Sequence, residues 1–190
     1  MTKVLKINVQ ELDSAFLESL KEEFANSDVE IWVHDQPETI PSLTDEAFWK
    51  LIALLDWDQT GNDAKVVAPL VLELEQKPLA LIYRFLDLLS EKLWHLDTRH
   101  HAQVFLDDPE EEGYLSSDDF LYARCAVVAN GKEYYEKVLH QPSEMPTHLT
   151  FEPLLYVAMT AYQNKTGKSL MALPPHNYET YSNKKGWAKE

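Results

Sequence analysis

Residues 118–139 read DDFLYARCAVVANGKEYYEKVL, and this stretch sets the expectation for the whole fold. It places one arginine, Arg124, inside an almost wholly apolar run that predicts a buried helix. Gly131, after Asn130, predicts a break before a short helical continuation to Leu139. The helical neighbours of Arg124 three and four positions away are all apolar: Phe120, Leu121, Val127 and Val128. Arg124 is therefore expected in the core or in the wall of a pocket.

A buried guanidinium needs a compensating group, because an unpaired charge in an apolar interior is very costly. The helix predicted for residues 78–95 carries one polar stripe, at spacings of three, four and four residues: Arg84, Asp87, Glu91 and His95. We expect Asp87 or Glu91 to pair with Arg124. This polar centre is interpreted first as an internal ion pair that fixes helix packing, and alternatively as an anion-binding arginine in a cleft.

The chain from Thr44 onward has helical periodicity, so the fold class is expected to be mainly α. Thr44 is a good N-cap, and Gly167 stands at a natural C-terminal cap. Further helices are predicted over 63–75, 78–95, 98–105, 117–139 with a break at Gly131, and 151–163.

A different pattern precedes this region. Residues 3–9 and 29–33 alternate like strands, and the residues between them that recur at helical spacing are Leu12, Phe16, Leu17, Leu20 and Phe24. The predicted organisation is a strand–helix–strand appendage (1–36), a linker (37–43), a helical domain (44–168) and an extended tail (169–190). Such a small appendage cannot bury both faces of a two-stranded sheet, so it must dock on the main body or pair with a second copy.

The formal net charge of −15 disfavours nucleic acid and anionic membrane surfaces as partners. This negative charge is compatible with a basic protein partner, and the acidic run 107–112 could contact one. Solubility alone also explains the acidity of the chain. The single cysteine, Cys125, allows no intramolecular disulfide and is interpreted as a buried hydrophobe rather than a thiolate. No signal peptide and no apolar run of about 20 residues is found, so a cytoplasmic location is expected.

Two clusters of polar residues have the composition of metal sites. His95, Asp97, His100 and His101 are ligand types that zinc and iron use, but their spacing suits one helical face poorly, and Asp97 can instead cap the next helix. Residues 56–61 resemble the start of a calcium loop, yet Val67 stands where that motif needs glutamate. No metal site and no cofactor is predicted, and phosphate-binding glycine loops and nucleophile elbows are absent from the sequence.

The pattern FWKLIALLDW at 48–57, followed by FLYARCAVVANGKEYYEKVL at 120–139, resembles a bacterial family, domain of unknown function 4240. The matching positions are Phe48, Trp49, Phe120, Arg124, Gly131, Tyr135 and Glu136. The resemblance covers about residues 45–167 and implies a helical fold without an assigned activity. The segment before Asp45 is similar, in a generic way, to the small strand–helix–strand pieces at the start of some bacterial antitoxins.

The leading hypothesis is a non-enzymatic protein-interaction or regulatory module that self-associates through its N-terminal unit. It rests on the missing catalytic motifs, the acidity and an appendage that needs a partner surface. The alternative is an enzyme or small-anion binder with a cleft around Arg124, Asp87 and Glu91. The tail residues Tyr178, Tyr181, Lys184, Lys185 and Trp187 either pack on the body or on another subunit, or remain free.

Overall fold

A computed structural model describes residues 12–25, 27, 43–106 and 115–188 of the chain. It divides into two compact units, Met1–Thr39 and Ile40–Glu190. In the first unit, the predicted helix is confirmed as α1 (Ser14–Glu23), capped by Asp13, whose carboxylate accepts a hydrogen bond from the Phe16 amide. None of its residues is buried. The predicted strands at 3–9 and 29–33, the linker at 37–42 and the acidic run at 107–112 lie outside the described residues.

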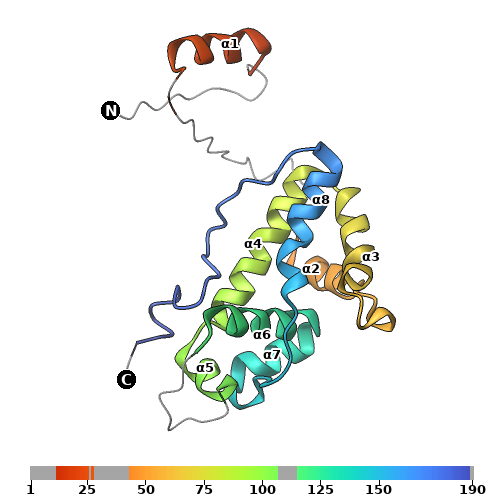
Figure 1. Cartoon of the computed structure of the whole chain (residues 1–190), viewed down its shortest axis with the longest axis vertical. Helices are drawn as coiled ribbons and strands as arrows, with labels where there is room; N and C mark the ends of the chain where they lie inside the picture. Colours follow the sequence, from red (N-terminus) through yellow and green to blue (C-terminus); the bar gives the residue numbers. More distant parts are fainter. Residues whose placement is uncertain (1–11, 26, 28–42, 107–114, 189–190) are drawn as a thin grey trace. The chain divides into compact units, whose positions relative to one another are not determined.

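The second unit is helical, as predicted (Figure 1). Its helices are α2 (Asp45–Ile52), α3 (Asp63–Glu75), α4 (Leu79–His95), α5 (Arg99–Phe105), α6 (Ser117–Ala129), α7 (Lys132–His140) and α8 (Val157–Thr166). Short 3₁₀ helices cover Trp57–Gln59, Pro142–Glu144 and Glu152–Tyr156. Within the described ranges, no helix combines the length and the apolar character needed to cross a bilayer.

Local chemistry explains where these helices begin and end. The Thr44 hydroxyl accepts a hydrogen bond from the Ala47 amide and starts α2, as predicted. Gly131 and Gly167 have φ angles of 93° and 71°, which glycine adopts without steric cost, and they separate α6 from α7 and end α8. The predicted helix over 151–163 begins instead as a 3₁₀ turn.

The core lies between α4 and the helices around it. The apolar face of α4 buries Ile82, Phe85, Leu89 and Leu93 completely or almost so. Phe85 packs against Phe48 of α2, with ring centroids 5.1 Å apart. Helix α6 is buried along most of its length, which explains why its apolar residues show no single face. The burial expected for Arg124 from its apolar neighbours is confirmed, since it has no exposed surface.

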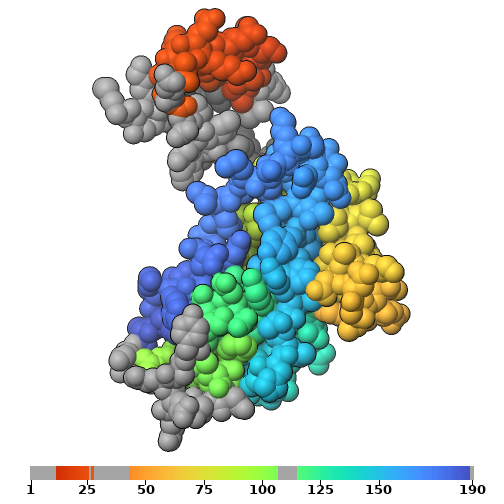
Figure 2. All heavy atoms as spheres, in the orientation of Figure 1, coloured from red at the N-terminus to blue at the C-terminus, as the bar shows by residue number. Residues whose placement is uncertain are grey.

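After Gly167 the chain turns and runs back along α4 toward α5 as an extended segment, drawn in dark blue in Figures 1 and 2. We call residues 168–188 the C-terminal strap. Figure 2 shows it lying against the green atoms of the helical unit. Tyr178 and Trp187 pack on the hydrophobic core, so the strap is packed on the body of its own chain.

Candidate functional site

The buried arginine at the centre of α6 is held by main-chain and hydroxyl oxygens. Nη1 of Arg124 donates to the carbonyl oxygen of Leu93 at 2.9 Å and to that of Tyr178 at 3.0 Å. Nη2 donates to Thr180 Oγ1 at 2.8 Å. The guanidinium carbon also lies 4.9 Å from the ring centroid of Phe120, a distance suited to a cation–π contact. Arg124 thus joins α4, α6 and the strap.

The predicted ion pair between Arg124 and Asp87 or Glu91 is wrong. Among the described residues no carboxylate forms an ion pair with Arg124, because carbonyl and hydroxyl oxygens of α4 and the strap occupy its two Nη atoms. Its buried Nε atom has no hydrogen-bond partner in the described part of the chain. Asp87 and Glu91 are half-buried, and the charges that act on Asp87 are those of its helix neighbour Arg84 and of His176. Burial raises the pKa of Asp87 above its ordinary value, and these two charges offset that rise only in part.

The acidic partner of this region is Asp97, between α4 and α5. Its carboxylate is fully buried and accepts hydrogen bonds from the Tyr181 amide at 3.1 Å, the Asn183 amide at 2.9 Å and the indole Nε1 of Trp187 at 2.8 Å. The Ser182 hydroxyl lies 3.2 Å from it. A buried carboxylate with this many donors is well compensated, and all four donors come from the strap.

Asp97 and Arg124 carry opposite charges, and both form hydrogen bonds with the strap. Burial lowers the pKa of Arg124, and the nearby charge of Asp97 opposes this effect. The two charges thus compensate each other through space, while each makes its hydrogen bonds to the strap. A main-chain bond from the Arg99 amide to the Gly186 carbonyl, 2.9 Å long, fixes the strap against α5. We call this arrangement the strap clamp.

The structure does not bring the four metal candidates together. Asp97 is engaged by the strap, and Thr98 rather than Asp97 caps α5. The ring of His101 lies between Thr98 Oγ1, at 2.7 Å from Nδ1, and the Val138 carbonyl, at 3.1 Å from Nε2. In the described ranges no three His, Cys, Asp or Glu side chains gather in a metal-binding group.

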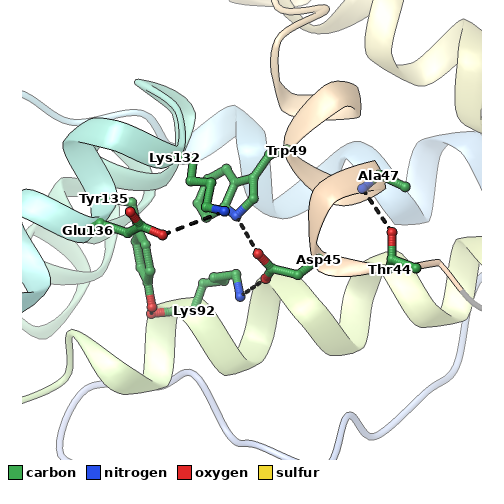
Figure 3. Close-up of polar contacts among 8 residues, drawn as sticks. All are labelled: Thr44, Asp45, Ala47, Trp49, Lys92, Lys132, Tyr135 and Glu136. Atoms are coloured by element: carbon green, nitrogen blue, oxygen red, sulfur yellow. Dashed lines mark hydrogen bonds and ion pairs between the residues drawn. The ribbon is translucent and has the colours of Figure 1, made fainter.

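A second buried charge was missed by sequence reasoning. Lys92 of α4 is 9% exposed and forms an ion pair with Asp45 at the start of α2 (Figure 3). Nε1 of Trp49 donates to the other carboxylate oxygen of Asp45 at 2.9 Å. The Lys92 ammonium lies 5.7 Å from the Trp49 ring and 5.8 Å from the Tyr135 ring. This lysine cluster ties α2, α4 and α7 together.

The sequence carried a signal for it. Lys92 stands three residues after Leu89 and four before Leu96, both buried, and such apolar helical neighbours indicate a buried charge as they do for Arg124. The cluster also explains why the early motif contains Trp49 and the late motif contains Tyr135. The two rings pack against each other, with their centroids 5.2 Å apart. Glu136 instead faces Lys132, 3.7 Å away, on the surface of α7.

Replacing Lys92 with methionine is expected to lower the free energy of unfolding at pH 7 by about 1 kcal/mol, because Asp45 loses its partner while the packing volume is kept. Desolvation raises the pKa of Asp45, but the hydrogen bond and charge of Lys92 outweigh it and hold this pKa below its ordinary value of 3.8. Its contribution is therefore present above pH 3.8 and is lost as the pH falls through the lowered pKa.

The difference in the free energy of unfolding between wild type and Lys92→Met, measured by urea titration, should thus become smaller below about pH 4. The control is Lys50→Met, which removes an exposed ion pair with Glu46 and is expected to change stability by less than about 0.5 kcal/mol. A difference that stays constant down to pH 3 would contradict this role for Asp45.

Other candidate residues have structural roles. Cys125 is fully buried, and burial raises the pKa of its thiol to about 12, which is the opposite of a reactive thiolate. In the calcium-like segment, Asp56 accepts a hydrogen bond from the Asp58 amide and shapes the turn before α3. That helix is capped by Asn62, whose side chain accepts a hydrogen bond from the Lys65 amide.

Comparison with known proteins identifies one family. A family model described as "Protein of unknown function (DUF4240)" matches residues 43–164. No curated protein and no solved structure matches the chain. The matched range contains Arg124, Asp97 and Lys92, whereas the strap residues that bind Asp97 lie beyond its end.

Proposed function

The chain belongs to the DUF4240 family, and from its own geometry we propose that it is a non-enzymatic interaction module that self-associates through its N-terminal unit. The observation that carries the proposal is the state of α1. This helix aligns Phe16, Leu17 and Leu20 along one side, yet none of its residues is buried, and Leu17 is 45% exposed. An apolar row of this kind on a short helix is typical of a contact surface.

The size of the first unit supports the same proposal. It spans 39 residues, Met1–Thr39, and the only cysteine of the chain lies elsewhere. Units below about 40 residues usually need a disulfide, a metal or an oligomeric partner to be stable. A second copy of the chain is present in any solution of the protein and can serve as this partner. Twofold dimers are the commonest protein assemblies. We include a cytoplasmic location in the proposal, which suits the single buried thiol of Cys125.

The chemistry of the helical unit points the same way. Its buried charges are engaged internally: Arg124 and Asp97 by the strap, and Lys92 by Asp45. The alternative of a reactive or anion-binding cleft at Arg124, Asp87 and Glu91 loses its support, because Arg124 has no exposed surface and its Nη atoms are occupied.

The test is the molar mass of the full chain by size-exclusion chromatography with light scattering. A chain mass of 22.0 kDa predicts a dimer of twice that value. Leu17→Glu, which places a charge on the apolar row of α1, should give the monomer. Ala15→Glu adds the same charge on the opposite, exposed side of α1 and should leave the dimer intact. A monomeric wild type, or a dimer that survives Leu17→Glu, would reject the proposal.

A further inference from the structure

A hollow of about 720 Å³ lies beside α5, between the end of α4, the end of α7 and the strap. Its polar lining comes mainly from His95, Thr98, Arg99, His100, Gln103 and Lys185, and Leu139 and Pro142 add apolar surface. Pockets that hold small molecules have volumes of roughly 300–1,000 Å³ and combine apolar walls with a few polar groups. We call it the α5 pocket.

The lining of the α5 pocket is unusual for this chain because none of the described residues that form it has an acidic side chain. The whole chain has 32 acidic against 17 basic residues, so a surface of average composition would be negative. In the described part of the chain, neither the Arg99 nor the Lys185 side chain has an ion-pair or hydrogen-bond partner. The Asp97 carboxylate is turned toward the strap. Two cations are thus available to a ligand.

The backbone that surrounds the pocket is held in place before any ligand arrives. The strap carries Lys185 into the lining, and the bond between the Arg99 amide and the Gly186 carbonyl holds it there. Gly186 fits so closely that a Cβ atom would lie 2.8 Å from Thr98 Cγ2 and 3.0 Å from the Asp97 carbonyl oxygen. Both ring nitrogens of His101, another residue of the lining, have partners. A preformed site loses little ordering entropy on binding.

From this geometry we propose that the α5 pocket binds a small molecule that carries a phosphate or diphosphate group. The planar guanidinium of Arg99 matches phosphate oxygens in a bidentate manner, and Lys185 supplies a second, compact positive charge. A phosphate monoester carries up to two negative charges at neutral pH, which two cations can balance. Leu139 and Pro142 offer a surface for the uncharged part of the molecule.

The histidines extend the polar lining. Burial lowers the pKa of His95, and the negative charge of Glu91, which lies outside the lining, opposes this only in part. The neutral ring of His95 is a hydrogen-bonding group rather than a third fixed charge at neutral pH. The net charge of −15 repels long polyanions, so the site is suited to a small anion and not to a nucleic acid backbone.

The experiment is isothermal titration calorimetry of the full chain with ADP and with inorganic pyrophosphate. We expect both to bind, and Arg99→Gln and Lys185→Gln each to weaken binding by about tenfold, equivalent to about 1.4 kcal/mol for one charge-assisted contact. The matched control is Lys65→Gln, an exposed lysine of α3 that removes the same charge elsewhere and should change binding less than twofold.

Imidazole signals in NMR spectra give a second readout. On addition of ADP, the ring signals of His95 and His100 should shift, while those of the exposed His148, outside the pocket, should not. The proposal is overturned if neither probe binds at about 1 mM, the weak end of specific affinities. It is also overturned if Lys65→Gln weakens binding as much as Lys185→Gln does, or if citrate binds as tightly as pyrophosphate. Because these readouts do not involve α1, they are independent of self-association.

Discussion

Replacing Arg124 with alanine is expected to lower the free energy of unfolding by about 3–5 kcal/mol, the largest effect of any single substitution considered for this chain. Two causes add. Truncation leaves a cavity beside Phe120. Because the position is fully buried, solvent does not replace the hydrogen bonds of the guanidinium. The carbonyl of Leu93 loses its donor, and an unsatisfied buried acceptor costs roughly 1–3 kcal/mol.

Urea denaturation followed by circular dichroism measures this effect. The midpoint should fall by about 1–2 M for a urea dependence of about 2–3 kcal/mol per molar. Arg124→Met separates the two causes, because methionine keeps most of the packing volume and removes only the hydrogen bonds and the charge. It should be less destabilising than Arg124→Ala.

The matched control is Arg99→Ala. Arg99 is a half-buried arginine whose side chain has no hydrogen-bond partner in the described part of the chain, and its loss should change stability by about 0.5 kcal/mol or less. An Arg124→Ala protein that unfolds at the wild-type urea midpoint would contradict the role of Arg124 as a link between α4, α6 and the strap.

Replacing Asp97 with asparagine should have the second largest effect, about 2–3 kcal/mol, although the two side chains have nearly the same shape. Both oxygens of Asp97 are acceptors: one faces the Tyr181 amide and the Trp187 indole, the other the Asn183 amide. An asparagine presents an NH₂ group on one side, so at least one buried donor would face another donor. The charge that opposes Arg124 is lost as well.

The loss should be concentrated in the strap. Limited trypsin digestion at Lys184 and Lys185 should become faster in Asp97→Asn, and the fluorescence of Trp187 should shift toward that of an exposed indole. Asp118→Asn, an exposed carboxylate at the start of α6, removes the same charge and should leave both signals unchanged. Equal digestion rates for wild type and Asp97→Asn would rule out Asp97 as the anchor.

The helices could be predicted from the sequence because their signals are local. The hydroxyl of Thr44 and the positive φ angles at Gly131 and Gly167 act within one turn. Hydrophobic spacing indicated α4, and a nearly continuous apolar run indicated α6. The burial of Arg124 followed for the same reason, since its helical neighbours are apolar.

The partners of the buried charges could not be predicted in the same way. Spacing on one helix shows which residues share a face, but it does not show which distant segment covers that face. The strap is polar and rich in proline, so its sequence predicted only an extended segment. Three of its hydrogen bonds to Arg124 and Asp97 use main-chain groups, which leave no trace in the sequence. The other three use the side chains of Thr180, Ser182 and Trp187, whose types alone do not indicate a distant partner.

The strap clamp also bears on where this protein can be cut. A fragment that ends with the family match near residue 164 would keep two opposite buried charges and lose the segment that covers both. Charges left uncovered in an apolar interior destabilise it strongly. The smallest fragment of the helical unit that folds cooperatively is therefore expected to extend to Ala188, and the boundary of the family does not coincide with the boundary of the folding unit.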